Sequence, residues 1–135
     1  MNYWLIKSEP VKWSWDNQVA AKTTHWDGVR NYQATIYLKA MKLGDLAFFY
    51  HSNEGKEIVG IVKIVREFYL DPKDETGKFG MVEVEAVEKL AKPVTLAEIK
   101  SDPALAEMVL VKNSRLSVQP VTPDEWAHVT GLAAA

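Results

Sequence analysis

The chain has no cysteine among its 135 residues. Disulfide bonds, thiolate nucleophiles and cysteine-ligated metal sites are therefore excluded. Its three histidines, His25, His51 and His128, fall on different predicted elements and do not have the spacing of a ligand set. We accordingly expect neither a metal ion nor a cofactor.

Long apolar runs and an excess of positive charge are also missing. No stretch approaches the roughly 20 apolar residues of a membrane span, and Met1–Ile6 lacks the basic and apolar regions of a signal peptide. We expect a cytoplasmic protein that does not bind membranes. The formal net charge of -2 argues against nucleic-acid binding through an extended basic surface, so any contact with nucleic acid must be local.

The composition that remains is that of a globular protein. Hydrophobic residues make up 47% of the chain and charged residues 25%, which is close to the average of folded domains. A chain of this length can bury a core without disulfides. We expect one domain, residues 1–135, acting as a monomer.

Short apolar patterns predict five strands, at residues 1–7, 46–51, 57–67, 80–89 and 115–119, with a loop at 22–27. Capping signals predict helices after Ser14, Thr95, Asp102 and Thr122, the last ending at Gly131, and apolar spacing predicts another at 32–41. The order of these elements indicates an α+β fold, a mostly antiparallel, partly closed β-barrel of five to six strands with flanking helices.

Four polar clusters, residues 7–9, 26–31, 50–52 and 114–117, stand where a predicted strand gives way to a helix or loop. Each has an ordinary explanation, for example Lys7 and Glu9 as a surface pair or Trp26 as a core residue. In a barrel of this order the clusters can nevertheless meet at one end, so together they predict a pocket.

The second cluster combines groups that suit a planar polar ligand. Trp26 and Tyr32 offer flat aromatic faces, and Arg30 offers a charged guanidinium group. The Asn31 amide can both donate and accept hydrogen bonds. Gly28 allows close approach of the backbone. A nucleobase has both a π face and a polar edge, so this chemistry favours a base held by stacking and edge hydrogen bonds.

The common signatures of nucleotide folds and hydrolases are missing: G-x-G-x-x-G, G-x-x-x-x-G-K-[ST], G-x-S-x-G and H-E-x-x-H do not occur. Their absence lowers the expectation of catalysis and favours a binding module.

Five segments, Lys7–Pro10, Trp26–Ala34, Gly44–Asn53, Ile58–Val62 and Ser114–Val121, closely resemble the EVE-domain family, which includes the thymocyte nuclear protein family. The resemblance runs through the whole chain in the same order. It implies a PUA-like barrel, related to YTH and ASCH domains, that binds modified bases in DNA or RNA. One departure is Phe79-Gly80, where related sequences often have tryptophan, which could change the size of the ligand.

Carried onto matching positions, the resemblance implies a ligand pocket formed by Ser8, Glu9, Trp15, Trp26, Gly28, Val29, Arg30, Asn31, Tyr50, His51, Ser52, Arg115, Leu116 and Ser117. Lys7, Arg30 and Arg115 are expected to meet nucleic-acid phosphates. The leading hypothesis is a non-catalytic module that recognises a modified or flipped nucleobase and has no catalytic residues.

Two alternatives stay open. Related ASCH-type domains include base amidohydrolases, and Lys7 with Glu9 or Tyr50 could form a general acid/base and nucleophile pair. The other alternative is a protein-interaction module whose pocket has no ligand.

Overall fold

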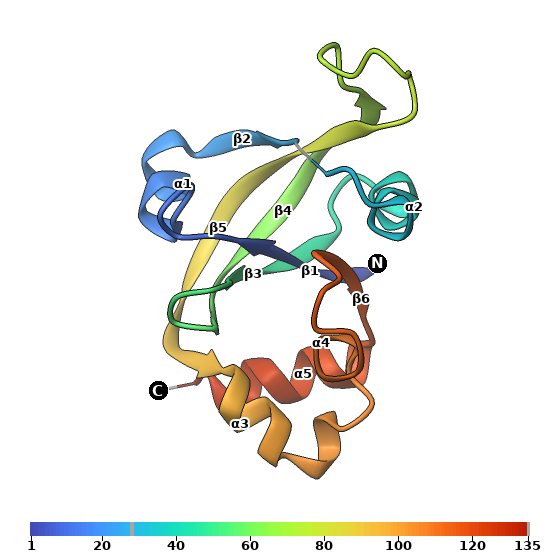
Figure 1. The fold of residues 1–135 in the computed structure, drawn as a ribbon. Coiled ribbons are helices and arrows are strands. Elements are labelled where there is room, and N and C mark those ends of the chain that lie inside the picture. Colours follow the sequence, from blue (N-terminus) through green and yellow to red (C-terminus); the bar gives the residue numbers. More distant parts are fainter. Residues whose placement is uncertain (28, 135) are drawn as a thin grey trace.

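In the computed structural model, which describes residues 1–27 and 29–134, six strands form one curved sheet in the order β2-β5-β4-β3-β1-β6 (Figure 1). They are β1 (Tyr3–Ser8), β2 (Thr23–Trp26), β3 (Leu46–His51), β4 (Glu57–Leu70), β5 (Gly80–Thr95) and β6 (Val118–Val121). Only β1 and β3 run parallel among these neighbours. The predicted α+β fold is confirmed, and β2 and β6 remain as the edges of an open sheet.

Strand β2 lies where the sequence predicts a loop, and that prediction is wrong. Its four residues pair antiparallel with β5, from Thr23 opposite Glu85 to Trp26 opposite Val82. So short a strand gives too little alternation to recognise, and it forms because β5 supplies a template for hydrogen bonding.

The two long strands β4 and β5 extend beyond their predicted ends and bend along their length. Their pairing shifts register at several points, including between Ile58 and Gly60 and between Ile64 and Arg66. Such bulges increase the local twist, so one strand pair can follow the curved sheet from end to end.

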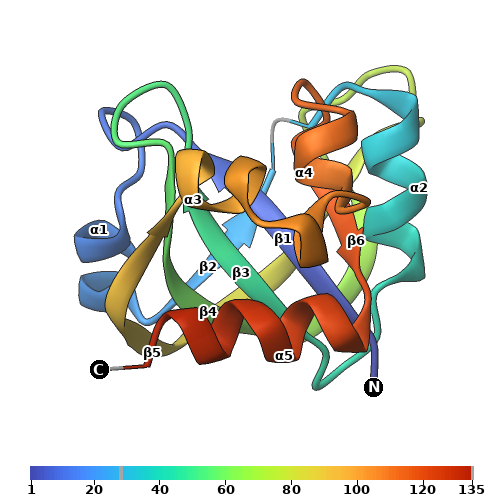
Figure 2. The same ribbon diagram turned by 90° about the horizontal axis from the view of Figure 1, so that it is seen from below.

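The helices cover two sides of the sheet (Figure 2). Those after β1 are α1 (Trp15–Ala21) and α2 (Tyr32–Ala40), and those after β5 are α3 (Leu96–Ser101), the 3-10 helix η1 (Pro103–Leu105), α4 (Val109–Lys112) and α5 (Pro123–Leu132). The caps at Ser14, Thr95 and Thr122 are confirmed, each with a reciprocal capping box. The single helix predicted after Asp102 is in fact η1 and α4, and α5 continues past Gly131.

The central strands are buried on both faces, which explains their continuous apolar runs. In β1, Trp4 and Ile6 belong to the core under α1 and α2, whereas Leu5 belongs to the core under α3 to α5. Phe49 and Phe48 of β3 divide between the two cores in the same way. Strand alternation thus gives the sheet two hydrophobic layers.

Gly60 of β4 makes room for the first of these layers. A Cβ atom built on Gly60 would stand 2.5 Å from the ring of Trp15, which is 4% exposed. The Trp15 ring also packs edge-on against Phe49, with centroids 5.4 Å apart. The missing side chain at Gly60 therefore lets α1 approach the sheet.

We predict that Gly60→Ala destabilises the protein by about 1–3 kcal/mol, because the added methyl group must displace the rigid Trp15 ring. Urea unfolding measures the change. Gly131→Ala is the matched control: the new Cβ meets nothing within 4 Å on helix α5, so stability should rise by about 0.5–1 kcal/mol. Equal stability of the Gly60→Ala variant and the parent would contradict this packing.

Candidate functional site

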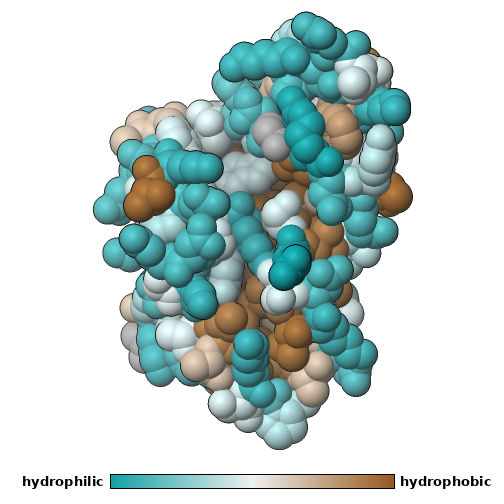
Figure 3. Space-filling model, viewed as in Figure 1, coloured by the Kyte–Doolittle hydropathy of each residue, from teal (hydrophilic) through white to brown (hydrophobic). Residues whose placement is uncertain are grey.

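A cleft of about 510 Å³ opens where β1 ends, between the turn after β1 and the edge strand β2. In the space-filling view, apolar surface gathers toward the middle of this side of the molecule, within a largely hydrophilic periphery (Figure 3). The cleft is lined by Lys7, Ser8, Glu9, Lys12, Trp13, Thr24, His25, Trp26, Asp27, Val29, Arg30 and Ser117.

Trp13 forms a wall of this cleft and is held at several points. The backbone N–H groups of Lys12 and Trp13 both donate to the Glu9 carbonyl oxygen at 2.9 Å, which closes the turn after β1. The indole Nε1 donates to Gln18 Oε1 at 2.9 Å, and the Ser8 hydroxyl donates to the Trp13 carbonyl oxygen. The orientation of the indole ring is therefore fixed before any ligand arrives.

Trp26 and Val29 supply the apolar part of the cleft. Trp26 is 9% exposed and packs edge-on against Phe49, with ring centroids 5.6 Å apart. Val29 is also buried and belongs to the same core. Because these side chains are anchored in the core, the cleft has a hydrophobic floor that does not need to rearrange.

Lys7 also lines the cleft and is half-buried at the end of β1. Its Nζ donates to the Ser114 carbonyl oxygen at 2.6 Å and stands 5.7 Å from the centroid of the Tyr50 ring. Burial lowers the pKa of the Lys7 ammonium below its usual value. This contact connects the cleft to the segment before β6.

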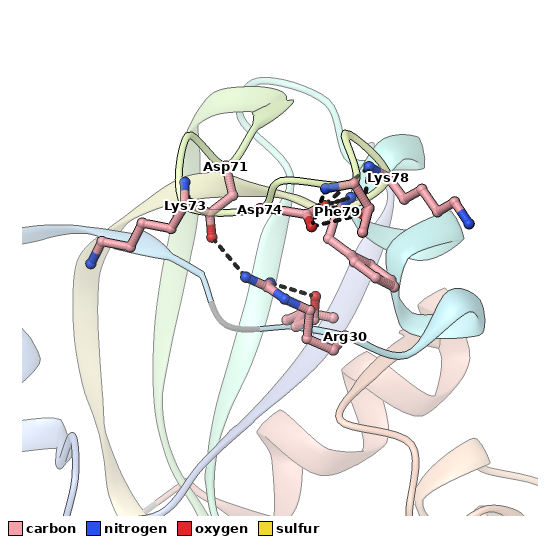
Figure 4. A network of polar contacts seen from close by, with 8 residues as sticks. Arg30, Asp71, Lys73, Asp74, Lys78 and Phe79 are labelled. Carbon is pink, nitrogen blue, oxygen red and sulfur yellow. Dashed lines mark hydrogen bonds and ion pairs between the residues drawn. The ribbon is translucent and has the colours of Figure 1, made fainter.

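Arg30 is directed toward the loop between β4 and β5 (Figure 4). Its Nη2 meets Asp71 Oδ2 at 3.2 Å, and its Nη1 donates to the Val29 carbonyl oxygen at 3.1 Å. The guanidinium carbon stands 5.4 Å from the centroid of the Phe79 ring. Asp71 is 4% exposed. The hydrogen bond from the Lys73 N–H, and to a lesser extent the contact with Arg30, hold the pKa of the Asp71 carboxyl group below its usual value.

The same loop is organised from within by Asp74. Its carboxylate accepts hydrogen bonds from the backbone N–H groups of Thr76, Lys78 and Phe79, the last at 2.7 Å. These contacts, the Phe79 N–H first, lower the pKa of Asp74 to about 2. A loop with its own hydrogen bonds can hold Asp71 in place as the partner of Arg30.

Charges of both signs surround the cleft. Lys12 and Glu9 form an exposed ion pair at 3.5 Å, and Asp27 adds a second carboxylate. Within residues 1–27 and 29–134, no cluster of three histidine, aspartate or glutamate side chains could hold a metal ion. No helix in the described ranges is long and apolar enough to cross a membrane.

Of the residues predicted to bind a ligand or phosphates, the cleft gathers Lys7, Ser8, Glu9, Trp26, Val29, Arg30 and Ser117. Three of the four predicted clusters thus contribute to one cleft. Gly28 lies outside the described residues. Whether these side chains bind a ligand stays a prediction.

The third predicted cluster does not line this cleft. Tyr50 is 3% exposed in the core under α3 to α5, where burial raises the pKa of its hydroxyl group. His51 Nε2 accepts the N–H of Trp15 at 3.0 Å and so holds the first turn of α1. Ser52 donates its backbone N–H to the Ser8 carbonyl oxygen at 2.9 Å. These residues brace the ends of β1 and α1.

The remaining predicted residues also lie away from the cleft lining. Trp15 and Leu116 are core residues, because their large apolar side chains are packed in the same hydrophobic layer and almost fully buried. Asn31 caps α2, with its Oδ1 accepting the N–H of Ala34 at 2.9 Å. Arg115 is exposed in the segment before β6. Phe79, the departure from related sequences, touches Arg30 instead of lining the cleft.

Lys12, Trp13, Thr24 and His25 line the cleft although the sequence does not place them there. Asp27 also lines it; it belongs to the predicted cluster 26–31 but not to the residues assigned to the ligand. Thr24, His25 and Asp27 belong to β2 and the residue after it, where the sequence predicts a loop. The available signal was Trp13, because a tryptophan in a turn between Pro10 and the cap Ser14 lies outside any apolar periodicity.

An open, curved, mostly antiparallel sheet with flanking helices, and a cleft at its open side, defines this protein as a PUA-like domain. The EVE domain family model matches residues 2–132, and the chain belongs to this family. The family resemblance noted in the sequence is therefore confirmed.

Several known proteins are similar over nearly the whole chain. Thymocyte nuclear protein 1 of Homo sapiens is 40% identical, over 97% of this chain and 73% of its own length. The NMR structure of Rpa0253 from Rhodopseudomonas palustris has 56% identity and a TM-score of 0.94, covering 98% of this chain and 93% of that one. A crystal structure of human THYN1 protein in complex with 5-methylcytosine-containing DNA has 39% identity and a TM-score of 0.90. It covers 100% of this chain and 99% of that one.

We predict a pH dependence that originates at His51. Burial lowers the pKa of its imidazole below the usual 6.5, outweighing Glu57 and Asp16, which raise it. A lowered folded-state pKa means that the stabilisation is complete above about pH 6.5 and is lost as pH falls through the folded pKa. Urea unfolding from pH 8 to pH 5 should show this loss in the parent.

His51→Gln is the comparison, because glutamine can accept the Trp15 N–H but does not titrate. Its stability should fall less steeply between pH 6.5 and pH 5 than that of the parent. Identical slopes for the two proteins would rule out His51 as the origin.

Proposed function

We propose that this protein binds a modified nucleobase in DNA, flipped out or single-stranded, and holds it in the cleft without catalysis. The observation that carries the proposal is the Trp13 indole, fixed by Gln18 as a wall of a 510 Å³ cleft with an apolar floor. A volume of this size suits a small planar ligand, and base stacking on an aromatic ring contributes about 1–3 kcal/mol.

The human relative supports the choice of ligand. That protein was crystallised with DNA containing 5-methylcytosine, and it matches this chain from end to end. The cleft of this chain offers polar side chains beside the aromatic surface, among them Ser8, Ser117 and Thr24. Such groups can read the edge of a base once it has left the stack.

Affinity must come from the cleft rather than from net charge, which is -2. Lys12 is exposed at its edge, and Lys7 and Arg30 line it. The Arg30 guanidinium already forms an ion pair with Asp71, so a phosphate that binds Arg30 would share it with this carboxylate. A few local cations suit one or two phosphates beside the bound base.

The direct test is fluorescence anisotropy with single-stranded and duplex oligonucleotides carrying cytosine, 5-methylcytosine or other modified bases at one position. At least one modified base should bind well above its unmodified parent. If folded protein shows no such preference across the panel, the proposal fails. Formation of a product of altered mass in the same samples would instead identify an amidohydrolase, with Lys7→Ala as its inactive variant.

We predict that Trp13→Ala lowers affinity for the preferred oligonucleotide by about 5- to 150-fold, because the stacking surface is lost. Trp13 is partly exposed and lies in a turn, so the variant should remain folded. Anisotropy measures affinity, and urea unfolding checks folding. Unchanged affinity in a folded variant would exclude Trp13 as the stacking wall.

We predict that Lys12→Ala weakens binding to every oligonucleotide alike and reduces the slope of log affinity against log salt by about 0.7–0.9, the value for one phosphate contact. Lys39→Ala is the matched control, since it removes an exposed lysine of α2 away from the cleft lining. Equal slopes for the two variants would show that Lys12 does not meet a phosphate.

A further inference from the structure

Gln18 is a fully buried amide in α1, with 0% of its surface exposed. Both the oxygen and the nitrogen of the amide form hydrogen bonds. Its Oε1 accepts from the Trp13 indole at 2.9 Å, and its Nε2 donates to the Lys22 carbonyl oxygen at 2.9 Å. Burying an amide costs free energy that a leucine or methionine at this position would avoid, which suggests that Gln18 has a role beyond filling space.

One partner of Gln18, Trp13, lines the cleft, and the other, Lys22, immediately precedes a strand that lines it. Trp13 stands in the turn after β1, whereas Lys22 ends α1 and immediately precedes β2, the strand that supplies Thr24 and Trp26. Lys22 has a φ of +63°, a conformation that residues other than glycine rarely adopt. Its carbonyl oxygen also accepts the Ala86 N–H of β5 at 2.9 Å.

One side chain therefore bridges the Trp13 wall to the start of the β2 wall. The hydrogen bond to Lys22 stabilises an uncommon backbone conformation, and the hydrogen bond to Trp13 fixes the plane of the indole. Since both contacts come from one planar amide, Gln18 links the position of Trp13 to that of the residue before β2.

We propose that Gln18 is a positioning residue that sets the width of the cleft and, through it, the preference for a modified over an unmodified base. This role rests on the proposed function. Gln18 does not line the cleft and acts through Trp13 and β2. Loosening the walls should let both bases bind with similar affinity.

The test uses Gln18→Met, which keeps the length of the side chain but removes both hydrogen bonds. The ratio of affinities for the preferred modified oligonucleotide and its unmodified parent should fall at least about threefold, as expected for coupled neighbours. In ¹⁵N NMR spectra of the protein without nucleic acid, the Trp13 indole N–H should exchange faster with solvent. An unchanged ratio in a folded variant overturns the proposal.

Two further variants separate positioning from stability. Asn17→Ala breaks the capping box with Ser14 and destabilises α1 without touching Trp13, so it should lower the unfolding midpoint and leave the affinity ratio unchanged. Trp13→Phe removes the indole donor but keeps a ring. In its background, Gln18→Met should change the ratio much less than in the parent, and fully additive effects would contradict coupling through the indole.

The outcomes distinguish this role from the proposed function itself. Absence of any preference in the parent protein overturns the proposed function and the selectivity role together. A clear preference in the parent that Gln18→Met retains overturns only the role of Gln18.

Discussion

The parallel pairing of β1 with β3 is the constraint on which the rest of the structure depends. The six residue pairs from Tyr3 opposite Leu46 to Ser8 opposite His51 lie at the centre of the molecule, mostly buried on both faces. Parallel strands cannot be joined by a tight turn. The chain must leave the end of β1 and return to the start of β3, and this excursion contains α1, β2 and α2.

The cleft is a consequence of that excursion. After β1 the chain turns at Trp13, passes through α1, and adds β2 to the far edge of the sheet, beside β5. The sheet remains open between its edges (Figure 1). Residues at the end of β1 and in β2 line the cleft. The connection that allows β1 and β3 to run parallel thus also provides the walls of the cleft.

Buried and partly buried polar contacts hold this excursion in place. Gln18 bridges Trp13 and Lys22, His51 accepts the first N–H of α1, and Asn31 caps α2. Apolar packing alone tolerates small shifts, whereas hydrogen bonds with defined geometry fix orientation. An open site with walls fixed in this way can distinguish ligands that differ by a small group, provided that its shape does not relax around each of them.

The sequence by itself determined the α+β class, the central strands and the capped helices, because apolar alternation and caps such as Ser14 and Thr95 act between residues close in the chain. It also predicted that Ser8 and Arg30 lie close together, and both line the same cleft. Only the tertiary structure decided that β2 is a strand, that His51 faces α1, and that Trp13 lines the cleft. Those outcomes depend on partners far away in the sequence, which local patterns do not encode.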